Sequence, residues 1–338
     1  MAEHDGVDAV QTLFERGRAG HVHSVARLIS LVDGDGERCR EAMRIAEASA
    51  RPYVVGITGA PGAGKSTLTR GLVKKLRQTY DRIAILSVDP SSPVTGGALL
   101  GDRLRFQELN DDDRVFARSL ASRGRMGGLA ALVPDAIRVL AAVGFGLVVV
   151  ETVGIGQVEC DVAALADTLV LVAAPGWGDH VQAAKAGVLE VVDVIVVNKD
   201  DLGGADRLVA DFEEMLGLRH GTPGEWRVPV IRVTADKEIG IERVVASLQA
   251  HRHWIERDGA AGPDRARRWF DVEDRLQRSL EEFWRRLRAS KTYHRVQVAY
   301  AGASLDSQQA VSDLLAEYRE IVIDGLRSLP LAGGEERQ

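Results

Sequence analysis

The segment Gly56–Leu72, which reads GITGAPGAGKSTLTRGL, constrains the fold more than any other part of the sequence. Gly59, Gly64, Lys65 and Ser66 satisfy the pattern G-x-x-x-x-G-K-[ST], after an apolar run and before an apolar-periodic stretch. The pattern requires a strand, a glycine-rich loop and a helix in succession, because the helix N-terminus must direct unpaired N–H groups at phosphate oxygens. It therefore predicts a phosphate-binding loop within an α/β fold.

Each residue type in this loop has a physical task. The glycines let the backbone wrap closely around phosphate oxygens without a side-chain clash. Lys65 is expected to reach the β- and γ-phosphates, and the Ser66 hydroxyl is expected to bind Mg²⁺. A glycine-rich turn with a purely structural role would leave the lysine unexplained. The predicted phosphate-binding residues are Gly59, Ala60, Pro61, Gly62, Ala63, Gly64, Lys65, Ser66 and Thr67.

Apolar runs spaced along the chain predict the sheet around this loop. The runs YVVGIT, RIAILSV, GLVVVE, TLVLVAA, VDVIVVN and VPVIRVT alternate with helical stretches between Tyr53 and Trp254. Near-continuous apolar runs suit strands that are buried on both faces of a parallel sheet, with helices covering it. We therefore predict an α/β fold with a mostly parallel sheet, in a nucleotide-binding domain over residues 51–256.

Helical patterns flank this domain on both sides. Residues 1–50 have apolar positions at helical spacing and predict an N-terminal helical extension. Residues 264–330 carry two apolar stripes, from Trp269 to Leu287 and from Val311 to Leu326, and predict a C-terminal helical arm. Because an apolar face must be buried, these helices pack either on their own domain or on a second copy of the chain.

The overall composition narrows the choice of partners. The chain of 338 residues has a net charge of −6, which gives no general attraction to nucleic acid or anionic lipid. Its longest apolar run, Val139–Val150, is too short to span a bilayer, and the acidic start lacks the apolar core of a signal peptide. We expect a cytoplasmic protein with neither a nucleic-acid nor a membrane partner.

A second motif indicates which nucleotide is bound. Asn198, Lys199 and Asp201 form an N-K-x-D pattern at the end of VDVIVVN. Guanine presents an N1–H and an exocyclic amine side by side, and the Asp201 carboxylate can accept both, whereas adenine would leave it unpaired. The stem of Lys199 can lie against the ring, and Thr234 and Ala235 are expected to offer a backbone contact to the guanine oxygen. The alternative is a polar loop after a strand.

Acidic residues near strand ends indicate a metal and hydrolysis site. Glu151 ends the run GLVVVE and suits a water-mediated Mg²⁺ contact, while the N–H of Gly154 is placed to sense the γ-phosphate. Asp89 ends another strand, and Asp102 lies in a long glycine-rich loop that could order itself around Mg²⁺ and the γ-phosphate. The alternatives are a helix N-cap for Asp89 and a solvated carboxylate for Asp102.

Together these segments resemble the MeaB/ArgK family of GTPases, the methylmalonyl-CoA mutase-associated chaperones. The resemblance covers residues 15–330 and is carried by GITGAPGAGKSTL, VDPSSPVTGGALLGDR, ASRGRMGGLA, VVVETVGIGQVE and VVNKDD. It implies a SIMIBI-type P-loop NTPase fold with N- and C-terminal helical extensions, the C-terminal one being a dimerisation arm of a homodimer. It also implies GTP and GDP as ligands and Mg²⁺ as the metal.

The same resemblance implies a partner and roles for the site residues. Members bind an adenosylcobalamin-dependent acyl-CoA mutase such as methylmalonyl-CoA mutase, and use GTP to gate cofactor loading and to protect the mutase. Lys65, Asp89, Asp102 and Glu151 match the positions expected to act in GTP hydrolysis. Ser66, Asp89, Asp102 and Glu151 match the metal positions.

Two segments depart from the family pattern. Gly101–Phe106 reads GDRLRF, and Gly176–Gly187, which is expected to face the partner, reads GWGDHVQAAKAG. A paralogue that serves a different acyl-CoA mutase therefore remains open. Two other functions also remain open: an ATP-dependent kinase, which is an older label for part of this family, and an interaction module that binds a nucleotide without turnover.

Overall fold

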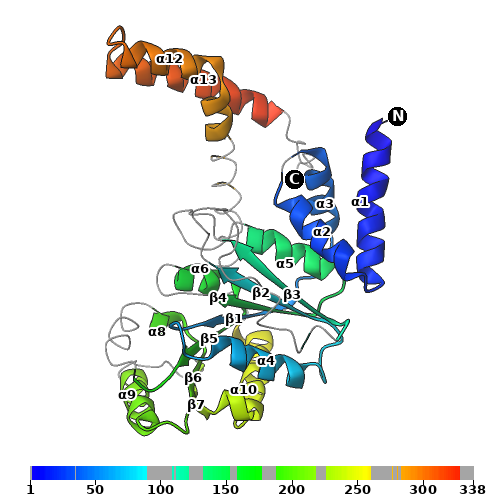
Figure 1. Ribbon diagram of the computed structural model, residues 1–338, viewed down its shortest axis with the longest axis vertical. Helices are drawn as coiled ribbons and strands as arrows, with labels where there is room; N and C mark the ends of the chain where they lie inside the picture. Colours follow the sequence, from blue (N-terminus) through cyan, green and yellow to red (C-terminus); the bar gives the residue numbers. More distant parts are fainter. Residues whose placement is uncertain are drawn as a thin grey trace, which may run out of the picture. The chain divides into compact units, whose positions relative to one another are not determined.

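The computed structural model describes residues 2–34, 36–89, 109, 112–121, 132–152, 158–176, 188–217, 226–259, 276, 280 and 283–327. The chain forms two compact units, Met1–Pro263 and Asp264–Gln338. The larger unit contains the sheet, and the described residues of the smaller unit are mainly helical (Figure 1).

A seven-stranded sheet forms the centre of the larger unit (Figure 1). The strand order is β3-β2-β4-β1-β5-β6-β7, and every neighbouring pair is parallel. The predicted α/β fold with a parallel sheet is thereby confirmed. The strands are β1 (Tyr53–Thr58), β2 (Ile83–Asp89), β3 (Val115–Ala121), β4 (Leu147–Thr152), β5 (Thr168–Ala173), β6 (Val194–Asn198) and β7 (Val230–Val233).

Helices cover both faces of this sheet (Figure 1). One face packs against α4 (Lys65–Leu76) and α10 (Ile241–Trp254). The other face packs against α5 (Leu132–Ala142), α6 (Val158–Leu165), α8 (Val188–Val191) and α9 (Ala205–Gly217). The central strands β4 and β5 are consequently buried along their whole length, which explains their continuous apolar sequences.

The edge strand β3 lies outside the six predicted apolar runs. Phe116 and Leu120 point into the core, but Arg118 between them is a charged residue, so the segment does not read as a buried strand. The Arg118 guanidinium donates to the carbonyl oxygen of Ala26 and, at 2.9 Å, to Ser30 Oγ. Both acceptors lie on α2 (Val22–Val32), so the charge is satisfied by a helix that is distant in the sequence.

Three helices precede β1 in the larger unit: α1 (Ala2–Arg18), α2 and α3 (Glu37–Glu47). They pack on α5 in the larger unit (Figure 1). Arg18 Nε donates to the carbonyl oxygen of Ala142 at 2.9 Å. Gly17 lets α1 approach closely, because a Cβ there would lie 2.8 Å from a methyl group of Val143.

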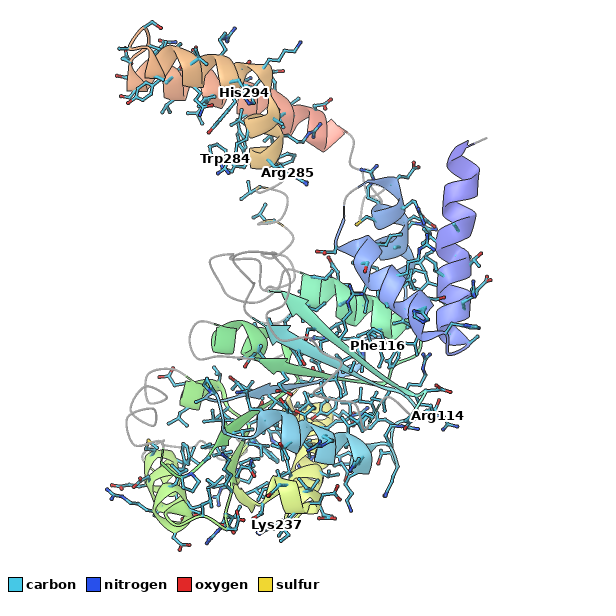
Figure 2. The ribbon with its side chains drawn as sticks, in the orientation of Figure 1. Arg114, Phe116, Lys237, Trp284, Arg285 and His294 are labelled. Atoms are coloured by element: carbon cyan, nitrogen blue, oxygen red, sulfur yellow. The ribbon has the colours of Figure 1, made fainter. Side chains whose placement is uncertain are left out.

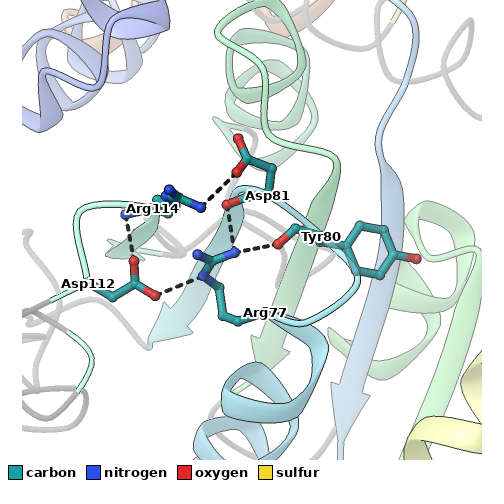
Figure 3. A network of polar contacts seen from close by, with 5 residues as sticks. All are labelled: Arg77, Tyr80, Asp81, Asp112 and Arg114. Carbon is teal, nitrogen blue, oxygen red and sulfur yellow. Dashed lines mark hydrogen bonds and ion pairs between the residues drawn. The ribbon is translucent and has the colours of Figure 1, made fainter.

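A charged cluster lies where the chain enters β2 and β3 (Figure 3). Arg77, just after α4, donates from Nε to Asp112 Oδ2 at 2.8 Å and from Nη1 to the carbonyl oxygens of Tyr80 and Asp81. Arg114 donates from its backbone N–H to Asp112 Oδ1 and from Nη1 to Asp81 Oδ1, both at 3.0 Å. The cluster fixes the start of β3 against the end of the helix that follows the phosphate loop.

The smaller unit contains the helical residues 283–289, α12 (Lys291–Ala301) and α13 (Ser307–Arg327). Ser290 begins α12 by accepting the N–H of Tyr293 at 3.1 Å. Thr292 Oγ1 then donates to Glu317 Oε2 at 3.0 Å and joins α12 to α13. The stripe that begins at Val311 coincides with α13, whereas α12 lies between the two apolar stripes of the predicted arm.

Several apolar side chains of the smaller unit are exposed within that unit. Among the described ones are Leu276, Leu280, Trp284, Val298, Tyr300, Val311 and Leu315. An exposed apolar surface of this kind is typical of a protein contact. Across the described ranges, no helix has both the length and the apolar character needed to cross a membrane.

Candidate nucleotide-binding site

The predicted motifs meet at the carboxyl edge of the sheet. β1 lies between β4 and β5, so the order of the strands reverses around it. Parallel α/β sheets bind ligands at such a reversal, outside the carboxyl ends of the strands. The phosphate loop follows β1 there, and Glu151 and Asn198 lie at the same edge near the ends of β4 and β6.

The phosphate loop adopts backbone conformations that favour glycine. Gly59, Gly62 and Gly64 have φ angles of 137°, 78° and 91°. A Cβ at Gly59 would lie 2.1 Å from the carbonyl oxygen of Val172, and a Cβ at Gly64 would lie 2.2 Å from Asn198 Nδ2. A Cβ at Gly62 would have no neighbour within 4 Å. The first and third glycines are therefore required by close packing as well as by φ.

Lys65 is buried inside this loop. Its Nζ donates to the carbonyl oxygens of Gly59 at 2.6 Å and Ala60 at 3.0 Å, and 6% of the residue is exposed. The ammonium therefore lies at the N-terminus of α4, where the helix itself contributes partial positive charge. An anion bound here would meet both sources of charge. The remaining loop residues differ in exposure: Ala60 and Ala63 are buried, Ser66 and Thr67 are half-buried, and Pro61 and Gly62 are exposed.

Two hydroxyl groups of α4 bind the buried carboxylate of Glu151. Ser66 Oγ donates to Oε1, and Thr69 Oγ1 donates to Oε2 at 3.0 Å. Only 1% of Glu151 is exposed. A serine hydroxyl beside a carboxylate supplies the oxygen ligands that Mg²⁺ prefers, directly or through water. The structure thus brings together two of the four predicted metal residues, and they fit the metal by their chemistry.

Asn198 joins the phosphate loop to the loop after β7. Its Nδ2 donates to the carbonyl oxygen of Ala63 at 2.8 Å, and its Oδ1 accepts the N–H of Ala235 at 3.0 Å. Asn198, Thr234 and Ala235 are all buried. The backbone of Thr234 and Ala235 is expected to contact the guanine oxygen, and in this structure the N–H of Ala235 is engaged by Asn198.

Asp201 lies at the surface of the turn that follows β6. Lys199 has a left-handed φ of 58°, and Leu202 donates its N–H to the carbonyl oxygen of Lys199 at 2.9 Å. Asp201 Oδ2 lies 2.7 Å from the Nζ of Lys237, and the hydrogen bond from this lysine holds the pKa of Asp201 below its usual value. The carboxylate is therefore ionised at neutral pH, as an acceptor of two N–H groups must be.

Some predicted site residues lie outside the described part of the chain. These are Asp102 and Gly154, together with the divergent segment 177–187. Asp89 ends β2, but its side chain is not among those described. The roles of Asp89, Asp102 and Gly154 therefore stay predictions. Among the described residues, no group of three or more His, Cys, Asp or Glu side chains is placed to hold a metal.

Two residues of the site were missed by the sequence reasoning. Thr69 lies three positions after Ser66, so helical periodicity alone places both hydroxyls on one face of α4 and could have revealed it. Lys237 offers no comparable signal, because it meets Asp201 only when the loops after β6 and β7 come together.

Sequence comparison identifies the family. The family model described as methylmalonyl Co-A mutase-associated GTPase MeaB matches residues 25–290. The chain belongs to the MeaB family. This confirms the resemblance on which the sequence analysis relied, and the P-loop GTPase fold class with it.

Relatives of this MeaB-family chain come from all three domains of life. A protein of Pyrococcus abyssi, named as a GTPase, is 45% identical over 262 residues, or 77% of this chain and 81% of the relative. GTPase ArgK of Escherichia coli is 33% identical over 237 residues, which cover 68% and 72% of the two chains. The mitochondrial methylmalonic aciduria type A homolog of Mus musculus is 35% identical over 210 residues, or 61% of this chain and 51% of the relative.

A solved structure supports the same fold for the MeaB-family chain. The crystal structure of an LAO/AO transport system kinase superposes with a TM-score of 0.65, covering 92% of this chain and 98% of that one. At 22% sequence identity, this likeness bears on the fold alone.

Proposed function

We propose that this MeaB-family chain binds guanine nucleotides and hydrolyses GTP to GDP and phosphate with the help of Mg²⁺. The observation that carries the proposal is the bridge made by Asn198, which hydrogen-bonds both to Ala63 in the phosphate loop and to Ala235 beside the N-K-x-D turn. The phosphate motif and the base motif thus belong to one site. Relatives in the family are named GTPases.

The base end of the site selects guanine through Asp201. An ionised carboxylate accepts the N1–H and the exocyclic amine of guanine, whereas adenine presents no donor at N1. Each hydrogen bond to a charged group contributes about 1.5–3 kcal/mol. Discrimination against adenine on the order of 100-fold or more follows. The stem of Lys199 covers one face of the ring.

The phosphate end of the site orients the nucleotide through Lys65 and the N-terminus of α4. Lys65 Nζ donates to the carbonyl oxygens of Gly59 and Ala60. From this position the ammonium would bind the β- and γ-phosphates of the nucleotide. Ser66, with Glu151 through water, would hold Mg²⁺, Asp89 and Asp102 would complete the set of ligands, and the N–H of Gly154 would meet the γ-phosphate. Bound Mg²⁺ supplies neutralisation of charge on the β- and γ-oxygens.

The biological role that we propose is that of a chaperone for an adenosylcobalamin-dependent acyl-CoA mutase. The family to which the chain belongs is described by its association with methylmalonyl Co-A mutase. GTP turnover then gates loading of the cofactor into the mutase and protects it. The apolar residues exposed on the smaller unit support a homodimer formed through that unit, since such a surface needs a partner.

Calorimetry with GDP and ADP tests the nucleotide assignment and separates it from a kinase. We expect wild-type protein to prefer GDP by about 100-fold or more, and Asp201→Ala to lose most of that preference. Preference for ADP would favour the ATP-dependent kinase. An unchanged preference for GDP in Asp201→Ala would overturn the role given to this carboxylate.

Turnover assays test hydrolysis and its coupling to the partner. GTP hydrolysis is measured with and without saturating methylmalonyl-CoA mutase, with Lys65→Ala as the inactive control. We expect slow basal turnover and acceleration by the mutase. A rate equal to that of buffer alone would favour a module that binds nucleotide without turnover, and an unchanged rate with the mutase would remove the coupling.

Sedimentation tests the homodimer. Val311→Glu and Leu315→Glu place charges on exposed apolar positions of α13 and are expected to convert dimer to monomer. Val191→Glu is the matched control, because Val191 is an exposed valine of the larger unit. A wild-type chain that sediments as a monomer would contradict the proposed assembly.

A further inference from the structure

Lys237 contacts the carboxylate that we assign to the base. Its Nζ lies 2.7 Å from Asp201 Oδ2. Lys237 ends the 3₁₀ helix η3 (Ala235–Lys237) after β7, whereas Asp201 follows β6, so the contact joins two loops of the site. Figure 2 labels Lys237 on the larger unit, and the side chain of this lysine is exposed.

The backbone that carries Lys237 is fixed on both sides. Lys237 donates its N–H to the carbonyl oxygen of Thr234 at 3.1 Å. Thr234 and Ile239 then form an antiparallel bridge, with N–H to carbonyl distances of 3.0 and 3.1 Å. Glu238 closes the turn with a left-handed φ of 55°. The backbone position of Lys237 is therefore fixed relative to β7.

The backbone that carries Asp201 is also fixed, but its carboxylate is not buried. Asp200 donates its N–H to the carbonyl oxygen of Val233 at 3.1 Å, and its carboxylate lies 2.5 Å from Arg232 Nε. The Asp201 side chain is 36% exposed, so burial alone does not select one rotamer. The hydrogen bond from the Lys237 ammonium favours one orientation of the Asp201 carboxylate, which packing does not do.

One carboxylate can serve both Lys237 and a purine. Its two oxygens offer about four lone-pair sites, and Lys237 uses one of them on Oδ2. We propose that Lys237 is a positioning residue for guanine recognition, which holds the Asp201 carboxylate in the orientation that accepts N1–H and the exocyclic amine. Holding the acceptor before the ligand arrives reduces the entropy lost on binding. The inference rests on the proposed function, in which Asp201 recognises the base.

A neighbouring ion pair provides a matched control. Lys74 Nζ lies 3.1 Å from Glu238 Oε1, and Glu238 is the residue after Lys237. The two lysine side chains have similar exposure, 42% for Lys74 and 55% for Lys237. Replacing either lysine removes one positive charge and one exposed ion pair from the same region. Only Lys237 contacts Asp201, as far as the described side chains show.

The experiment measures affinities for GDP and ADP by calorimetry in six proteins. These are the wild type, Lys237→Gln, Lys237→Arg, Lys74→Gln, Asp201→Ala and the double variant with Lys237→Gln and Asp201→Ala. We expect Lys237→Gln to bind GDP about three- to fivefold more weakly, the range of an exposed ion pair, and to bind ADP as the wild type does. Lys237→Arg should restore GDP affinity, and Lys74→Gln should leave it unchanged.

The double variant decides whether Lys237 acts through Asp201. If it does, Lys237→Gln has no further effect on GDP affinity once Asp201 is alanine. Unchanged GDP affinity in Lys237→Gln, an equal loss for GDP and ADP, or an equal loss in the Asp201→Ala background would each overturn the inference. A wild type that does not prefer GDP over ADP would instead refute the proposed function itself, so the two failures are distinguishable.

Discussion

Asn198 Nδ2 lies 2.8 Å from the carbonyl oxygen of Ala63, so the residue that ends β6 holds the phosphate loop after β1. The same side chain accepts the N–H of Ala235. Asn198 is 2% exposed, and water therefore does not replace these bonds when the amide is removed. The proposed base and phosphate ends of the site therefore share one buried residue.

Asn198→Ala should therefore lower stability and nucleotide affinity together. Two buried polar groups lose their partner, and we expect a loss of about 3 kcal/mol in the free energy of unfolding. Urea denaturation and GDP titration measure the two effects. Asn198→Asp is the informative companion, because it keeps the acceptor for Ala235 but replaces the donor to Ala63 with an acidic oxygen that faces the same carbonyl. Wild-type stability in Asn198→Ala would contradict the bridge.

Gly59→Ala and Gly62→Ala should differ in stability although both glycines have positive φ. At Gly62 the new Cβ enters open space. The free energy of unfolding therefore falls only by the strain of a positive φ in alanine, about 1–2 kcal/mol. At Gly59 the Cβ would lie 2.1 Å from a backbone oxygen in β5, and we expect a loss of at least about 3 kcal/mol. Equal unfolding free energies would show that the packing of Gly59 against β5 is unimportant.

Glu151→Gln should raise the Mg²⁺ concentration that GTP turnover requires. The amide nitrogen replaces one acceptor oxygen, so either Ser66 or Thr69 loses the acceptor of its hydroxyl proton, and the negative charge disappears. Changes in the groups around a metal commonly alter its affinity 10- to 100-fold, and we expect half-saturation at about tenfold more Mg²⁺. Thr69→Val keeps the carboxylate and should have a smaller effect. The site assignment would be wrong if Glu151→Gln and wild type titrate identically with Mg²⁺.

The Arg77–Asp112 pair should make a pH-dependent contribution to stability. Burial raises the pKa of Asp112, but the hydrogen bonds from Arg77 and from the N–H of Arg114 outweigh it, and the net pKa is lowered. A folded pKa below the unfolded one stabilises the fold above the unfolded pKa of about 3.9, and this contribution is lost as the pH falls through the folded value. The Asp112 side chain is 39% exposed, so solvent screens the pair.

Asp112→Asn tests this contribution by urea denaturation between pH 7 and pH 3.5. We expect a loss of up to about 1 kcal/mol at neutral pH that shrinks below about pH 4. Asp81→Asn is the control from the same cluster (Figure 3), because Asp81 pairs with Arg114 at a more exposed position than that of Asp112. A difference between Asp112→Asn and wild type that is constant over this pH range would exclude the mechanism.

The strands that carry the site were predictable because the sheet buries them on both faces. The runs that became β1, β4, β5 and β6 are almost entirely apolar, and the motif residues follow them directly. The edge strand β3 was not predictable, because Arg118 in its centre is satisfied by α2, about 90 positions earlier in the chain. The sequence around Arg118 therefore shows the charged residue but not the distant helix that satisfies it.

Within the site, sequence patterns identify residues but not their contacts. The phosphate and base motifs name Ala63 and Asn198, yet their hydrogen bond depends on β6 lying two strands away from β1 in the sheet. The same limit applies to Lys237 and Asp201, which belong to different loops. Only Thr69, at helical spacing from Ser66, lay within reach of a local pattern.

The strand that carries the phosphate loop emerges early from the ribosome but finds its neighbours late. Tyr53 pairs with Leu147 and Val55 with Thr168, so a nascent chain that ends before β4 offers β1 no neighbour on either side. Until both later strands have been translated, β1 has no paired strand to fix the geometry of the phosphate loop. The phosphate loop can therefore reach this geometry only after β5 has been translated, long after its own residues have left the ribosome.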